Sequence, residues 1–158
     1  MISKEINFIL PSNNDGGGNR WSYALASMLI KKNKDLKINF YYPQFDNLSN
    51  IYKLNNSVNA KIFKSKFKSK FLVYIFFIIY LKKTINKKTT IVISDPILSI
   101  FMFLFNKNLV IRNVASDDYN LFNFSHYRYF GFLPIYKLLT YISFFYKNVN
   151  FVFNSAYT

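Results

Sequence analysis

The stretch "INFILPSNNDGGGNRW", residues 6–21, joins a short apolar run to three consecutive glycines. The apolar run suits a buried parallel strand, and Pro11 with the polar residues after it ends that strand. Gly16, Gly17 and Gly18 then permit positive φ and carry no Cβ atoms. A ligand can therefore lie against bare peptide N–H groups at the positive end of the helix that follows. The alternative is that the glycines only make a tight strand-to-helix turn.

Outward from this stretch, strand and helix patterns alternate. Apolar residues at helical spacing begin at Trp21, and Lys31 and Lys32 stand in the last turn, where cations interact favourably with the helix dipole. We therefore expect a helix of about three turns that starts near Trp21. A strand pattern follows over residues 37–42, and Pro43 is expected to end it.

The rest of the chain continues this alternation. Further strands are predicted at residues 60–63, 90–94, 108–114 and 150–155. Helices are predicted over residues 64–83, after Pro96, and over residues 127–147. Because strands and helices alternate, the sequence predicts an α/β fold, a Rossmann-like open parallel sheet with helices on both faces.

Polar clusters follow four of the predicted strands. These clusters are Gly16–Arg20, Ser94–Asp95, Ser116–Asp118 and Asn154–Ser155. Ligands of open α/β sheets bind in the crevice beyond the carboxyl ends of the strands. We therefore expect the four clusters to face one cleft, although junctions between strands and loops are commonly polar in any case.

The composition limits the classes of protein and of site. A chain of 158 residues is about one domain long, and its 21 Lys and Arg against 7 Asp and Glu give a formal charge of +14. Such an excess of positive charge is typical of proteins that bind nucleic acid or an anionic membrane. Alternatively, it reflects a low-GC coding bias that enriches Lys, Asn, Ile, Phe and Tyr together. The absence of cysteine excludes disulfides and thiolate metal sites, and a single histidine without paired ligands predicts no metal site.

The positions of the aromatic residues favour a membrane partner over a nucleic-acid partner. The apolar runs at 71–81 and 97–105 are shorter than the roughly 20 residues that span a bilayer, and the N-terminus lacks a signal-peptide pattern. We expect a cytoplasmic chain, peripheral on the inner face of the cell membrane. The alternating Lys and Phe residues of 61–71 suit a helix lying on anionic lipid, or else the basic solvated face of a core helix. No nucleic-acid partner is predicted, because the aromatics lie inside apolar runs and arginine is scarce.

Several motifs together resemble one enzyme family. "INFILPSNNDGGGNRWSYALASMLIKK", followed by "KINFYYP", resembles the start of the amino-terminal domain of GT-B glycosyltransferases of the family-four type. "TIVISDP", "VIRNVASDDYNLF" and "NFVFNSAYT" are similar to later segments of the same domain. The resemblance rests on the order and spacing of these motifs and covers nearly the whole chain.

The resemblance implies that residues 1–158 are the acceptor-side domain of a retaining, metal-independent glycosyltransferase that uses no cofactor. It implies a nucleotide-sugar donor and a polysaccharide or lipid-linked acceptor. By position, Gly17 and Gly18 would line the cleft near the donor phosphates, and Arg20 would lie beside them. The implied substrate-binding residues are Gly16, Gly17, Gly18, Asn19, Arg20, Asp95 and Ser155, and the implied catalytic residues are Asp117 and Asp118.

The second domain of the family has no counterpart in these motifs. In the family, a carboxyl-terminal domain with paired glutamates grips the donor, whereas this chain contains only Glu5. The sequence is therefore expected to be half of an enzyme, inactive without a donor-binding domain. The alternative is a non-catalytic, membrane-associated or protein-binding module with the same fold. For Asp117 and Asp118 the alternative is a helix cap.

Overall fold

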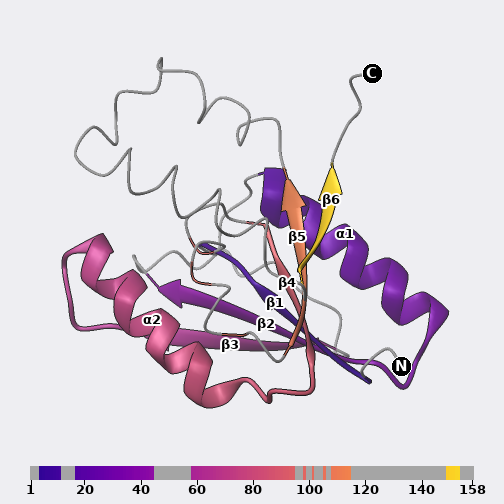
Figure 1. The fold of residues 1–158 in the computed structure, drawn as a ribbon, viewed down its shortest axis with the longest axis horizontal. Helices are drawn as coiled ribbons and strands as arrows, with labels where there is room; N and C mark the ends of the chain where they lie inside the picture. Colours follow the sequence, from indigo (N-terminus) through magenta and orange to yellow (C-terminus); the bar gives the residue numbers. More distant parts are fainter. Residues whose placement is uncertain are drawn as a thin grey trace.

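A six-stranded parallel sheet organises the molecule (Figure 1). The structure is a computed structural model that describes residues 4–11, 17–44, 58–94, 98, 101, 105, 108–114 and 149–153. The described elements are β1 (Glu5–Ile9), α1 (Gly17–Lys32), β2 (Lys37–Gln44), β3 (Val58–Lys64), α2 (Lys70–Thr84), β4 (Thr90–Ile93), β5 (Leu109–Val114) and β6 (Val149–Phe153).

The strand order is β3-β2-β1-β4-β5-β6, and every neighbouring pair is parallel. The chain winds outward from β1 to β2 and β3, and it then returns through α2 to β4 on the other side of β1. The direction of winding therefore reverses between β1 and β4, which makes that position the topological switch point of the sheet. This arrangement confirms the predicted Rossmann-like α/β fold.

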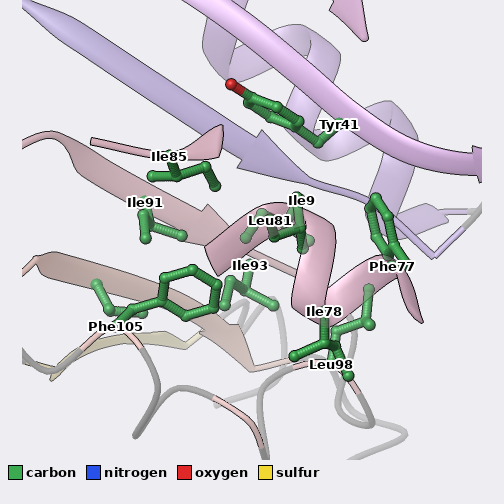
Figure 2. Packing of buried hydrophobic residues seen from close by; sticks show 11 residues of the cluster. Ile9, Tyr41, Phe77, Ile78, Leu81, Ile85, Ile91, Ile93, Leu98 and Phe105 are labelled. Atoms are coloured by element: carbon green, nitrogen blue, oxygen red, sulfur yellow. The ribbon is translucent and has the colours of Figure 1, made fainter. Parts of the chain in front are cut away.

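The two described helices cover opposite faces of the sheet, and alternate residues of each strand pack against one or the other. On the α1 face, Phe8 stacks on Phe40 with ring centroids 4.8 Å apart, and Tyr23 of α1 packs on the same ring at 5.0 Å. On the α2 face, buried residues of α2 pack on β1, β2 and β4 (Figure 2). The residues of this second cluster are Ile9, Tyr41, Phe77, Ile78, Leu81, Ile85, Ile91, Ile93, Leu98, Phe105 and Val110. Burial on both faces explains why β4 reads as the continuous β-branched run "TIVI".

A chain of buried hydrogen bonds crosses the sheet on the α2 face. Asn39 Nδ2 donates to Glu5 Oε1 at 2.7 Å and to Asn7 Oδ1 at 2.8 Å. Asn7 Nδ2 donates in turn to Thr89 Oγ1 at 2.8 Å, and Asn108 Nδ2 donates to the Thr89 carbonyl at 2.9 Å. The network therefore joins β2 and β1 to the turns that precede β4 and β5.

The predicted helix over residues 64–83 is wrong at its start. β3 continues to Lys64, in register with Gln44, and α2 begins only at Lys70. Between them the Ser65 hydroxyl accepts a hydrogen bond from the Phe67 N–H at 3.1 Å, which forms a local turn. Pairing with β2 thus extends the strand through the alternating lysines.

Pro43 does not end β2, contrary to the sequence prediction, since the strand runs to Gln44. The Tyr41 carbonyl accepts from the Leu10 N–H at 2.9 Å and therefore faces β1. Pro43, two residues later, faces the same side at the point where β1 has ended. Its missing N–H consequently breaks no ladder bond within a described strand pair.

The remaining boundaries agree with the sequence closely. β4, β5 and β6 lie within the predicted strands or start one residue away from them. The helices predicted after Pro96 and over residues 127–147 lie outside the described residues. No helix among the described residues has both the length and the apolar character needed to cross a membrane.

Candidate functional site

Gly17 and Gly18 form the first turn of α1, directly after the short segment that follows β1. The helix therefore starts one turn before the predicted Trp21. Neither glycine has a positive φ, so the conformational freedom of glycine does not explain why glycine stands at these two positions. The feature that these two positions do supply is the lack of a Cβ atom at the positive end of a helix, which suits an anion.

The charge at this helix start is positive. The first turn of α1 contains no acidic residue, and Arg20 is exposed there. A cation at a helix N-terminus opposes the helix dipole, so Arg20 lowers the stability of α1 slightly while raising the positive potential at its end. Asn19, beside it, is buried. The described part of the site is therefore electropositive and suited to a phosphate.

A contact between side chains ties this helix start to the switch point. Ser22, in the second turn of α1, and Ser94, directly after β4, are both buried, and their hydroxyl oxygens lie 3.5 Å apart in a long hydrogen bond. The start of α1 therefore lies against the carboxyl end of β4, which neighbours β1 in the sheet. This is the position in the sheet at which ligands bind in open α/β folds.

The sheet order bears on the expected convergence of the four polar clusters. The strands that precede them, β1, β4, β5 and β6, are consecutive neighbours and all parallel, so their carboxyl ends lie along one edge. Of the predicted site residues, the structure describes Gly17, Gly18, Asn19 and Arg20. The others lie outside the described residues: Gly16, Asp95, Asp117, Asp118 and Ser155. Their roles stay predictions.

Sequence reasoning missed Ser22, which is buried and bonds to Ser94. Its signal was spacing, because Gly18, Ser22 and Ala26 recur every four residues and so share one side of α1. Small side chains at Ser22 and Ala26 let the helix approach the sheet closely, since both are buried there. Close packing of α1 thus offers a structural reason for small residues beside the glycine turn.

Tyr42 near the end of β2 was also missed. Its side chain is buried, burial raises its pKa, and its hydroxyl has no hydrogen-bond partner among the described residues. By contrast the hydroxyl of Tyr41, on the other face of β2, accepts a hydrogen bond from Lys61 Nζ at 3.0 Å. This bond, together with nearby negative charge, holds the pKa of Lys61 above its ordinary value despite partial burial.

Tyr42→Phe is expected to raise the free energy of unfolding by about 1 kcal/mol, because it removes a buried hydroxyl without a partner. The matched control Tyr41→Phe removes a hydroxyl that accepts a hydrogen bond, and it should lower the same quantity by about 0.5–1 kcal/mol. Urea unfolding followed by circular dichroism measures both. A loss of stability in Tyr42→Phe would show that the hydroxyl bonds to a residue outside the described ranges.

Within the described ranges, no three His, Asp or Glu side chains gather where they could hold a metal ion. Comparison of the sequence with models of protein families and with curated proteins finds no match. Among solved structures, the fold is similar to that of the lipopolysaccharide outer core galactosyltransferase WaaB in its apo form, at 14% sequence identity and a TM-score of 0.48. The similarity covers 68% of this chain and 32% of that protein, so the chain spans about a third of the galactosyltransferase's length.

Proposed function

We propose that this chain is the amino-terminal, acceptor-side half of a GT-B glycosyltransferase. It transfers a sugar from a nucleotide-sugar donor to a polysaccharide or lipid-linked acceptor, at the inner face of the cell membrane. The observation that carries this proposal is the start of α1 at Gly17 and Gly18, placed at the switch point between β1 and β4. A sugar diphosphate fits this place because its charge meets the positive end of the helix dipole, where Gly17 and Gly18 carry no side chain.

The residues divide the proposed work between phosphate binding and chemistry. The backbone of Gly16, Gly17 and Gly18 and the side chain of Arg20 meet the phosphate charge, so that no metal ion is needed. Asn19, Asp95 and Ser155 contribute hydrogen bonds to sugar hydroxyls. One of Asp117 and Asp118, in the segment after β5, takes the catalytic position as a carboxylate. The proposed transfer retains the anomeric configuration of the sugar.

The proposed reaction requires a second domain that closes over the donor. Catalysis depends on binding the transition state more tightly than the substrates, and a single wall of a cleft leaves half of the reacting groups in water. We place the donor nucleotide on this second domain. It belongs to a continuation of this chain or to a separate polypeptide.

Nucleotide-sugar turnover tests the function. The chain is combined with the polypeptide encoded immediately downstream and with a panel of nucleotide sugars, and release of nucleoside diphosphate is measured. Turnover that requires both polypeptides supports the proposal. Absence of turnover with every donor, while the chain keeps its circular dichroism spectrum, would overturn it and favour a non-catalytic binding module.

Gly18→Ala is expected to separate a binding role from a purely structural one. Gly18 has helical backbone angles, so alanine should raise the free energy of unfolding by about 0.5–1 kcal/mol. Its methyl group would also push a phosphate away from the adjacent N–H groups, and loss of one charge-assisted hydrogen bond should lower turnover by about tenfold or more.

The matched control is Ser27→Ala, at an exposed position of the same helix. It should also raise stability, by a few tenths of a kcal/mol, and leave turnover unchanged. If Gly18→Ala raises stability and leaves turnover unchanged as well, the glycine serves only to start the helix. The phosphate-binding role would then be wrong.

A further inference from the structure

An apolar stripe runs along the outer side of α2. Leu72, Phe76 and Ile79 follow one another at helical spacing and are 38%, 41% and 44% exposed. The opposite side of the same helix is the buried one, where Val73, Phe77, Ile78 and Leu81 pack on the sheet. A helix that is apolar on all sides is ordinarily buried on all sides. Here the protein covers one side of α2 and leaves the other open.

The segment before α2 enlarges this surface. Phe67 is 44% exposed, and its ring stacks on that of Phe76 with centroids 4.7 Å apart. The turn in which Ser65 accepts from the Phe67 N–H holds the ring in this position. We call Phe67, Leu72, Phe76 and Ile79 together the α2 stripe.

Lysines border the α2 stripe at both ends. The exposed ones are Lys64, Lys66, Lys68, Lys82 and Lys83. The described residues include only two acidic ones, Glu5 and Asp35. Glu5 accepts a hydrogen bond from Asn39 across the sheet, and Asp35 lies in the turn between α1 and β2. The described flanks of the stripe are therefore cationic.

Charge and shape decide among the partners that such a surface fits. A second copy of the chain would bring its lysines against these lysines, which disfavours self-association through this face. A single-stranded nucleic acid would use the lysines but would gain no stacking from Leu72 and Ile79. A bilayer with anionic headgroups uses both features, since apolar side chains enter the boundary of the acyl region while lysines stay at the phosphates.

The length of the helix fixes how it would lie. With 15 residues and a rise of about 1.5 Å per residue, α2 is roughly 22 Å long, shorter than the ~30 Å hydrocarbon core of a bilayer. Its other side is also committed to the core of the protein. An arrangement parallel to the membrane plane is the one that satisfies both conditions.

We propose that the α2 stripe and its five flanking lysines form a docking surface for an anionic lipid bilayer, with α2 lying in the plane of the headgroups. This inference deepens the proposed function, on which it rests for the nature of the acceptor. The Tyr74 hydroxyl of α2 donates to the Pro11 carbonyl, directly after β1, at 3.4 Å. This contact ties the carboxyl end of β1 to α2, so docking would fix the distance between that edge of the sheet and the membrane that presents a lipid-linked acceptor.

Co-sedimentation with vesicles tests the lysines. The chain should bind vesicles of phosphatidylcholine mixed with phosphatidylglycerol, should bind pure phosphatidylcholine far more weakly, and should dissociate as salt is raised. The double variant Lys66→Gln/Lys68→Gln should bind about 25-fold more weakly, at about fivefold per lysine. The control Lys31→Gln/Lys32→Gln, at the end of α1 on the other face of the sheet, changes net charge equally and should bind as the wild type does.

A second pair of variants tests the apolar stripe. Phe76→Ser/Ile79→Ser should weaken vesicle binding by about tenfold or more, because two partly exposed side chains no longer enter the bilayer. The control Met28→Ser changes a side chain of α1 that is 59% exposed, and it should leave binding unchanged. Both variants should keep the wild-type circular dichroism spectrum and a cooperative urea transition, because the residues changed lie outside the buried core.

Four results would overturn the docking surface, the first three of which concern the variants and the vesicles. These are equal losses in the α1 controls, equal binding to vesicles without anionic lipid, and concentration-dependent dimerisation that Phe76→Ser/Ile79→Ser abolishes. Tighter binding to a single-stranded oligonucleotide than to vesicles would also overturn it. Turnover with a water-soluble acceptor depends on none of these variants, so failure of docking and failure of the transferase function remain distinguishable.

Discussion

Phe77→Ala is expected to lower the free energy of unfolding by about 4 kcal/mol, a large share of the 5–15 kcal/mol typical of a domain. Phe77 is fully buried in α2 and packs against Phe63 of β3, with ring centroids 5.8 Å apart, and against Tyr80 at 6.5 Å. Alanine would leave a cavity between the helix and the sheet that neighbouring side chains fill only in part. Equilibrium unfolding in urea measures the loss.

The adjacent Phe76 provides the control, since it is the same residue type, one position earlier on the same helix, but on the exposed side. Phe76→Ala should lower the free energy of unfolding by only about 1 kcal/mol, because it removes the stacking on Phe67 but leaves no cavity in the core. Equal losses in the two variants would mean that α2 does not pack on the sheet through the side that contains Phe77. In that case Phe76 would not lie on an exposed surface either.

Asn7→Ala is expected to lower the free energy of unfolding by about 3 kcal/mol. The substitution removes the donor to Thr89 Oγ1 and the acceptor for Asn39 Nδ2, and both groups are buried. Each keeps one other partner, since the Thr89 hydroxyl donates to the Asn86 carbonyl and Asn39 Nδ2 donates to Glu5. Each buried hydrogen bond lost in this way costs about 1–2 kcal/mol, so the two losses together set this size.

Asn59 of β3 serves as the matched control for Asn7. Asn7, Asn39 and Asn59 stand opposite one another in adjacent strands, but Asn59 is exposed. Asn59→Ala should therefore alter stability by about 0.5 kcal/mol or less. A small effect of Asn7→Ala would show that the network contributes little and that packing alone holds these strands together.

Local sequence patterns predicted most of the fold because most strands are determined by burial. The "TIVI" run of β4 is short, β-branched and buried on both faces, which favours a strand, and the alternation of strands with helices favours a parallel sheet. The helix of α2 was placed correctly over its apolar part, because an apolar run of that length is longer than a typical strand. The predicted start of this helix was wrong because β3 continues to Lys64, where it pairs with Gln44. The alternating lysines alone do not indicate this pairing.

The errors and omissions at the site have the same origin. Whether Pro43 ends β2 depends on where the neighbouring strand β1 ends, and the bond between Ser22 and Ser94 joins residues 72 positions apart. Both depend on residues that are distant in the sequence, so neighbouring residues do not predict them. The three consecutive glycines were recognisable in the sequence as a turn before a helix. The positive φ that glycine permits is not adopted by Gly17 or Gly18. For Asp117 and Asp118 the catalytic role stays a prediction.

The position of β3 at the end of the strand order has a consequence for how the chain behaves while it is being synthesised and stored. An outer strand offers unpaired backbone groups on which a second chain can add a strand, which is a common origin of aggregation. Lys61 and Lys64 project from β3 to opposite faces, and a copy of β3 paired alongside would meet them with its own lysines. The charge on this strand thus protects the margin of the sheet against edge-to-edge polymerisation.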